Sequence, residues 1–506
     1  MDIKILKRRA KKASSDKEMF RDLYQSAYEL ALPQRNLFTD YGKGSKKMSG
    51  VYTSDGMEAV NTFVNTMQST LTPSFTRWAE MKAGSLIPED LEDDINEALE
   101  EVTKTVFDTI DASNFNTAIA EFYYDLCVGT GCMLALEGTT DKSPIDFVTV
   151  PIADVALEEG TSGTIDGIYR IHKIAGRLIE EQWPDAKVPA KLKAKIDNKP
   201  EDEVELKEAT YKDYKANKWN YEVFCDDYDD KLVERVLDSN PWIIARWSKI
   251  AGEAYGRGPL LQALPDIKTL NILREYGLRA YALNAIGVYT VADEDAVNSN
   301  NIILEPGAFI SVERNSGPNG PSIAALPQVG NFQIQEYEQQ GLKDSINRLM
   351  LNNRLPSDAG PVRSATEIAE RVKDNSVDIG AAYGRLVYEL VQKIIKRVVD
   401  VLMSKGLIQL DEKFSKIDNL FTKVVIQSPA AKRQRYEDVQ NVVQALQILF
   451  GISPETAVMT FNMGEVGKFI ADNGGVPAKL LNSEEEAQQV KQEIQQAQAA
   501  ANQPKA

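Results

Sequence analysis

Apolar residues recur at helical spacing over much of this chain of 506 residues. Intervals of three and four residues between apolar positions favour amphipathic helices, because they place those positions on one face. Such intervals predict helices over 54–71, 89–111 and 116–128. An earlier helix is expected to end at Pro33, after a basic arm at 1–15.

Short apolar runs separated by glycine and proline replace this pattern from Met133 to about Tyr169. Runs of this kind predict strands and hairpins. Residues 186–220 are highly charged, and we expect them to form a helical excursion on the surface. Two further strands are predicted at 221–228 and 242–247. The chain is therefore expected to be α+β and mainly helical.

Two predicted helices of similar length, 265–285 and 331–353, enclose an insert rich in Gly, Pro and Asn. Pro265 suits the first turn of a helix, where its missing N–H has no intrahelical partner. At 1.5 Å per residue the two helices would be about 32 and 35 Å long, so they can run antiparallel side by side. The insert carries three short strand-like runs, GVYTV, NIILE and AFISVE.

A Pro/Gly loop leads from the second helix to a long helical segment, 364–405. Gly380 and Gly384 interrupt this segment and predict a bend, since glycine weakens a helix interior. A strand at 423–428 and further helices follow. The Gln/Ala-rich segment 482–506 has a weak coiled-coil spacing that also suits a frayed tail.

Composition narrows the classes of function. The net charge is −17, whereas a conventional nucleic-acid-binding domain is basic. This charge argues against tight DNA binding but not against DNA passing by. No apolar stretch approaches the ~20 residues that span a bilayer, and no signal-peptide pattern precedes the first helix. We therefore expect no membrane association and synthesis in a cytoplasm.

Catalytic chemistry finds little support in the sequence. The one histidine, His172, lies in a strand-like run and has no second histidine with which to share a metal. Three cysteines form no CxxC or Cys/His cluster, and no phosphate-binding glycine motif occurs. Neighbouring acidic residues are expected by chance in a chain with 75 of them. We therefore predict no cofactor, no metal site and no enzymatic activity.

Several motifs resemble those of the portal, or head-to-tail connector, proteins of tailed bacteriophages, above all the short-tailed T7-like group. The strongest likeness lies in 245–271, and weaker likenesses lie in 28–35, 71–81, 129–131 and 363–374. The residues that carry it are expected to be structural: Trp247, Tyr255, Gly256, Arg257, Gly258, Pro259, Thr366 and Glu367.

The resemblance implies the portal fold, with wing, stem helix pair, β-rich clip and helical crown, assembled as a ring that is a dodecamer. On this layout the sequence divides as follows: 1–258 N-terminal wing, 259–285 stem helix 1, 286–330 clip, 331–353 stem helix 2, 354–363 tunnel loop, 364–405 long bent wing helix, 406–481 wing return strand and crown, and 482–506 tail.

The same resemblance implies a DNA channel at one capsid vertex that serves genome packaging, retention and ejection. Its partners would be double-stranded DNA, the terminase motor, the tail adaptor, and capsid and scaffold proteins. It would reside in the virion, after assembly in the host cytoplasm. Twelve copies at −17 each would carry −204, and an acidic wall lets DNA slide. The candidate DNA contacts are Lys343, Arg348, Arg354 and Arg363.

Two other interpretations of the function remain open from the sequence. The helix pair could pack as an ordinary hairpin in a structural or scaffold protein of a virion that forms no channel. A hydrolase that uses acidic residues ranks lowest. The four basic candidates could equally form ion pairs in the stem, and Asp344 suits that alternative because it precedes Arg348 by one turn.

Overall fold

The computed structural model describes residues 1–34, 50–84, 89–140, 143–292, 305–312, 315, 320–325, 332–352, 382–408, 422–426, 429–453 and 459–474. The predicted tunnel loop and tail lie outside these residues, as do 301–304 of the predicted strand NIILE, 364–381 of the predicted helix 364–405, and Arg354, Arg363, Thr366 and Glu367.

Four helices build the N-terminal half of the body. They are α1 (Ile3–Ala31), α2 (Asp55–Leu71), α3 (Glu89–Ala112) and α4 (Phe115–Val128). The predicted helix bounds agree within two residues for the last three. The basic arm is different from the expectation, because α1 is helical from Ile3 and buries Leu6, Ala10 and Ala13.

Two sheets form most of the described β structure of the body. Strand β2 (Thr130–Thr140) is central to the first, with β3 (Ser143–Thr149) and β9 (Trp242–Arg246) antiparallel on either side. The second sheet has five antiparallel strands in sequential order: β4 (Val155–Glu159), β5 (Ile165–Ala175), β6 (Glu203–Asp213), β7 (Lys218–Phe224) and β8 (Lys231–Leu237). A short 3₁₀ turn, η1 (Ile152–Asp154), leads into β4.

The predicted helical excursion at 186–220 is wrong for most of its length. Only α6 (Ala190–Asn198) is helical there; α5 (Leu178–Gln182) precedes it, and β6 and the first three residues of β7 occupy much of the rest. The physical reason is the alternation of charged and apolar residues in EVELKEATY, which has the period of a strand. This alternation buries Val204 and Leu206 on one face of β6.

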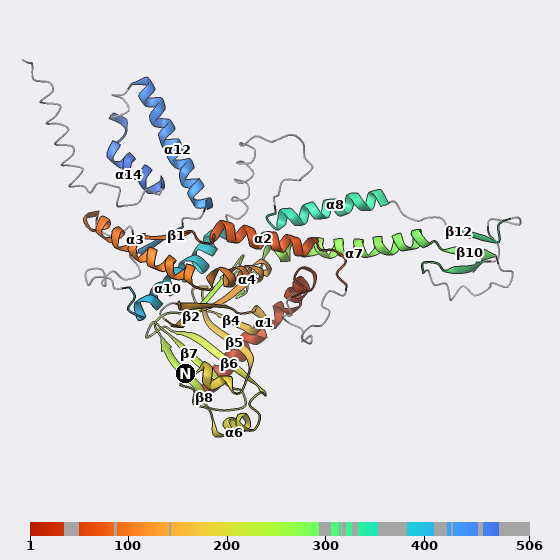
Figure 1. Ribbon diagram of the computed structural model, residues 1–506, viewed down its shortest axis with the longest axis horizontal. Helices are drawn as coiled ribbons and strands as arrows, with labels where there is room; N and C mark the ends of the chain where they lie inside the picture. Colours follow the sequence, from red (N-terminus) through yellow and green to blue (C-terminus); the bar gives the residue numbers. More distant parts are fainter. Residues whose placement is uncertain are drawn as a thin grey trace, which may run out of the picture.

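A helix pair, α7 (Pro259–Ile286) and α8 (Phe332–Leu349), projects from the body with a small sheet at its far end (Figure 1). That sheet contains β10 (Tyr289–Ala292), with β11 (Phe309–Val312) parallel and β12 (Ile323–Ala325) antiparallel to it. The helices span 28 and 18 residues, or about 42 and 27 Å, so the predicted equality of length is wrong. The difference arises because α7 begins at Pro259, with Pro265 inside the helix, and because α8 ends at Leu349 rather than at 353.

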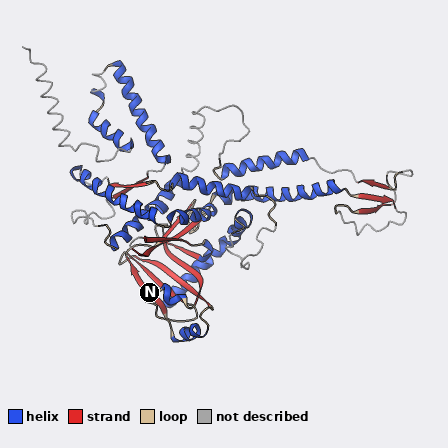
Figure 2. Cartoon of the chain, in the orientation of Figure 1, coloured by secondary structure: helices blue, strands red, loops and turns tan. Residues whose placement is uncertain are grey.

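The described part of the long segment is continuous helix from residue 382 to Ser404. It contains a π-turn, η3 (Val387–Val391), followed by α10 (Gln392–Ser404). Strand β13 (Thr422–Ile426) then pairs with β1 (Ala79–Ala83), and α12 (Pro429–Ile452) and α14 (Met463–Gly474) complete the described chain. Figure 2 shows these last two helices apart from the sheets, on the opposite side of the body from α6.

One large core joins α1–α4, the three-stranded sheet, the start of α7, the end of α8 and α10. Two smaller cores cover the five-stranded sheet. The root of the projecting pair therefore belongs to the main core: Leu260, Ala263, Leu264 and Ile267 are buried, and Ile346 and Met350 close the same core from α8.

Candidate functional site

The root of α7 is fixed by a close approach of two glycine-containing segments. Gly258 N–H donates to Val128 O at 2.8 Å, and Trp247 N–H donates to Gly129 O at 3.0 Å. A Cβ at Gly129 would overlap Gly256 O, and a Cβ at Gly258 would overlap Cys127 O. Only glycine allows backbones this close, so both segments need it.

Side chains from elements far apart in the sequence also hold the residues just before α7 in place. Tyr24 OH of α1 donates to Gly256 O at 2.5 Å, and Thr130 Oγ1 accepts from Gly256 N at 2.8 Å. Tyr255 OH accepts a hydrogen bond from Leu157 N at 3.0 Å, which ties the motif to β4. Burial raises the pKa of both tyrosines, so they stay neutral.

The remaining motif residues flank this root. Arg257 forms an ion pair with Glu253 at 2.9 Å and lies over the Phe20 ring, while Trp247 meets Phe63 edge to face. Pro259 occupies the first turn of α7, where no N–H is needed. The resemblance residues therefore join α1, β2, β9 and α7 at one point.

The π-turn in the long helix places an acid against the same region. Glu389, which lies in η3, accepts hydrogen bonds from Arg246 N at 2.9 Å and from the Arg246 guanidinium at 2.6 and 3.2 Å. Both side chains are less than 10% exposed. Arg246 also donates to Gly163 O at 3.0 Å. A π-turn offsets the helix by one residue, and such turns often mark functional sites.

Basic residues further along α10 bind the three-stranded sheet rather than solvent. Arg397 Nε donates to Ala135 O at 3.1 Å, and its NH1 donates to Ser239 Oγ at 2.6 Å. Lys405 Nζ donates to Gly138 O at 2.5 Å. Burial lowers the pKa of Lys393, which lies one turn after Glu389. Lys393 Nζ also donates to Ile244 O of β9 at 3.4 Å, so these contacts attach the long helix to β2 and β9.

The four candidate DNA contacts divide into three cases. Arg354 and Arg363 lie outside the described residues. Lys343 on α8 forms an ion pair with Asp55 of α2 at 3.1 Å, so it joins the helix pair to the body. Arg348 is exposed on α8. Asp344, its expected partner, accepts from Gln340 Nε2 at 3.0 Å.

The residues weighed as candidates for catalysis lie in surroundings that are typical of structural residues. His172 lies on β5, and its Nδ1 is 3.4 Å from a carboxylate oxygen of Glu208. Burial together with the Arg170 charge lowers the pKa of His172 to about 4. It is therefore neutral near pH 7. The three cysteines are buried and unpaired by disulfides. No group of acid, His and Cys side chains within the described ranges could hold a metal ion.

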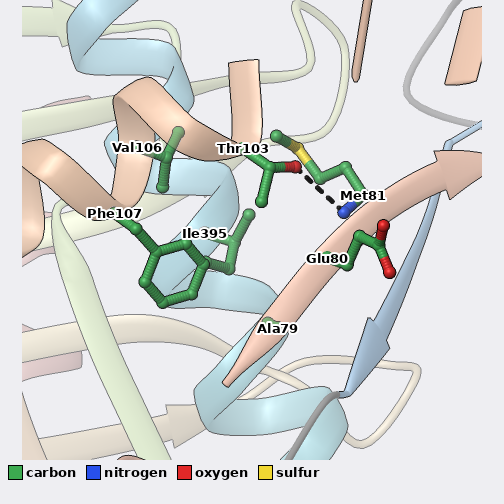
Figure 3. A pocket seen from close by; sticks show the side chains of 7 residues that line it. All are labelled: Ala79, Glu80, Met81, Thr103, Val106, Phe107 and Ile395. Atoms are coloured by element: carbon green, nitrogen blue, oxygen red, sulfur yellow. Dashed lines mark hydrogen bonds between the residues drawn. The ribbon is translucent and has the colours of Figure 1, made fainter. Parts of the chain in front are cut away.

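A small hollow between β1 and α3 is lined mostly by apolar side chains (Figure 3). Ile395 of α10 and Phe107 of α3 point into it, and Thr103 Oγ1 accepts from Met81 N at 3.2 Å. Such a lining is typical of a contact between packed elements rather than of a ligand site. Among the described helices, none combines the length and the apolar content that a bilayer crossing requires.

Comparisons with known proteins place these features in a family. Residues 4–481 match the family described as "Bacteriophage head to tail connecting protein". A probable portal protein of Bordetella phage BPP-1 is 19% identical over 500 residues, which cover 94% of this chain and 88% of that protein.

The portal protein of Pseudomonas phage phiKMV is 24% identical over 275 residues, 51% of this chain and 50% of that protein. A chain from a virion of a native gene transfer agent particle aligns over 77% of this chain and 98% of its own length, with 10% identity and a TM-score of 0.30. The last value is too low for an argument about fold. The family match spans nearly the whole described chain, including the glycine root of α7, the helix pair and η3. The chain belongs to the bacteriophage head-to-tail connecting family, the portal proteins of phage virions.

Proposed function

We propose that copies of this chain assemble into a ring around a central channel, through which the phage genome enters the capsid and later leaves. The observation that carries the proposal is the α7–α8 pair, which projects from the body and ends in a separate small sheet (Figure 1). Family membership supports the same function. Twelve copies remain our prediction for the ring, as does the short-tailed T7-like subgroup.

In this proposal α7 and α8 form the stem, and the sheet β11-β10-β12 belongs to the clip at 286–330. The body before α7 forms most of the wing, joined there by the long helix at 364–405. The helices α12 and α14 belong to the crown, and the loop at 354–363 lines the channel. Glu389 and Arg246 would then hold the middle of the long helix against the wing.

The clip is proposed to dock the terminase motor during packaging and the tail adaptor afterwards. Exposed apolar side chains on the small sheet support a docking role: Phe309 is 65% exposed and Ile323 55%. A partner that covers these side chains would remove their apolar surface from water, which favours binding. Capsid and scaffold proteins would contact the wing in the virion and in the host cytoplasm during assembly.

Weak contact with DNA follows from the charge of the chain. A net charge of −17 disfavours a tight grip on phosphates, which would slow translocation. Among the candidates on α8, Arg348 is the one that keeps an exposed side chain and is proposed to face the DNA, whereas Lys343 pairs with Asp55. The role is mechanical and needs no cofactor or catalytic group.

Negative-stain images of the purified protein test the proposal. We expect rings with a central hole. Compact solid particles over a range of salt and protein concentrations would contradict it and favour the structural protein that forms no channel. Rings that carry Arg348→Ala should form normally but bind DNA with a weaker dependence on salt; an unchanged dependence would remove Arg348 from the channel wall.

A further inference from the structure

The outer half of α7 exposes apolar and aromatic side chains on two sides. Ile272 is 48% exposed, Tyr276 60%, Leu278 49% and Tyr281 68%. Single exposed apolar residues are common on proteins and need no explanation. Four exposed apolar residues within ten positions of a projecting helix do need an explanation, because each leaves apolar surface in water.

The positions of these residues around the helix axis form two strips. Successive residues are about 100° apart. Ile272, Tyr276 and Arg279 then lie within about 60° of one another, and we call them strip A. Leu278, Tyr281 and Ala285 also lie within about 60° of one another, and we call them strip B.

The partner helix α8 occupies the side between the two strips. Ser345 Oγ of α8 donates to Asp266 Oδ2 of α7 at 2.7 Å, which fixes the side of α7 that α8 covers. Ala280 and Asn284 share this side and are only partly exposed. Strips A and B lie about 90° to either side of it. Each stem helix therefore offers two different lateral surfaces.

Two different lateral surfaces are what a ring of identical subunits requires. A contact between unlike surfaces repeats from copy to copy and closes when the rotation divides a full turn. A closed ring also has no rise along its axis, so a residue on strip A must meet strip B at the same height. Tyr276 and Leu278 differ in height by about 3 Å, and so do Arg279 and Tyr281.

The chemistry of the two strips is complementary. Arg279 of strip A lies within about 3 Å of Tyr281 of strip B in height, which the long arginine side chain can span to make a cation–π contact. Glu275 borders strip A, where it forms an ion pair with Arg279 at 2.5 Å. Arg274 lies on the side of strip B and differs from Glu275 by only one residue in height. The Arg274 charge of one chain would therefore lie near the opposite Glu275 charge of the next chain.

We infer that strip A of one chain packs against strip B of the next chain, and that this contact aligns the stems without axial offset. The occupant of each strip is thus a second copy of this chain. The inference rests on the ring proposed above and adds the surfaces and the register through which its subunits meet.

Paired cysteines test the inference. Tyr276→Cys and Leu278→Cys in one chain lie on opposite sides of α7, so they cannot bridge within that chain. With a short bis-maleimide, the double variant should give a ladder of covalent oligomers on a denaturing gel. Each single variant should stay monomeric, because each strip would meet an unlike strip. The native cysteines are buried, which keeps the background low.

A second pair, Arg279→Cys with Tyr281→Cys, should give the same ladder and guards against a local effect of the first pair. Imaging of the same samples separates the two proposals. Rings without a ladder from either pair would overturn the contact between strips while the channel proposal stands. Covalent dimers from a single variant would show a contact between like strips and overturn the inference. Samples without rings would overturn the channel proposal and this contact with it.

Discussion

The buried pair Arg246–Glu389 offers the sharpest test of how the long helix is held. Glu389 accepts three hydrogen bonds from Arg246, and both side chains are less than 10% exposed. Replacing Glu389 with Gln keeps the shape but leaves the Arg246 cation without its counter-ion. Removing one partner of a buried ion pair costs about 3–5 kcal/mol of unfolding free energy.

An exposed pair on the same chain gives a matched control. Lys193 and Glu180 form an ion pair at 3.2 Å, and their side chains are 57% and 61% exposed. Glu180→Gln should therefore cost at most about 1 kcal/mol, because solvent screens the pair. The difference between the two substitutions measures how much more a buried, multiply hydrogen-bonded ion pair contributes than an exposed one.

Urea unfolding followed by tryptophan fluorescence is a suitable assay, since the buried Trp242 and Trp247 lie on either side of Arg246 in sequence. All variants need the same protein concentration, because assembly adds to apparent stability. Arg246→Met combined with Glu389→Leu should lose less than Glu389→Gln, as no buried charge is left unpaired. Equal losses for Glu389→Gln and Glu180→Gln would refute the reasoning.

Two further predictions concern the five-stranded sheet and the root of α7. His172 is neutral in the fold, and its pKa of about 4 lies below the ordinary 6.5. The unfolded chain therefore binds more protons, and stability of up to about 3 kcal/mol should be lost as the pH falls from 6.5 towards 4. His172→Gln should flatten this part of the pH–stability profile; parallel profiles for the two proteins would contradict the assignment. Gly258→Ala should destabilise by at least about 1–3 kcal/mol in thermal unfolding, since its Cβ would overlap Cys127 O. Gly384→Ala, at an exposed helical position with open space around it, should instead stabilise by about 1 kcal/mol, and the same sign for both would count against the close approach at the root.

The sequence predicted those elements whose pattern is local. The helices α2, α3 and α4 have apolar residues at regular helical intervals, and their bounds were predicted within two residues. Strand β6 was missed because its inward positions include Glu208, which is buried with Arg170 and Tyr221. A charged residue on the buried face makes that face look polar in the sequence, so the period of two that marks a strand is easily missed.

Features of the site that depend on distant partners could not be predicted. The Arg246–Glu389 pair joins residues 143 positions apart, and the π-turn that aims Glu389 has no local sequence signal. The glycines at 256 and 258 were recognised by resemblance alone. Their physical role needs the second segment, 127–131, whose carbonyl groups they approach. Likewise, nothing local revealed that Lys343 meets Asp55.

The long-range contacts of the body also set an order for its folding during synthesis. The Tyr24 hydroxyl meets its acceptor only after Gly256 has been made, and the Ala135 and Gly138 carbonyl groups meet their donors only after Arg397 and Lys405, at separations of 232, 262 and 267 residues. At roughly 5–20 residues per second, the ribosome needs on the order of 13–53 s to reach Lys405 after it has made Gly138. During that interval β3 and β9 can already pair with β2, whereas the carbonyl groups of Ala135 and Gly138 lack the side chains that bind them in the folded chain. The three-stranded sheet can therefore form early, and its attachment to the helix at 382–404 follows later.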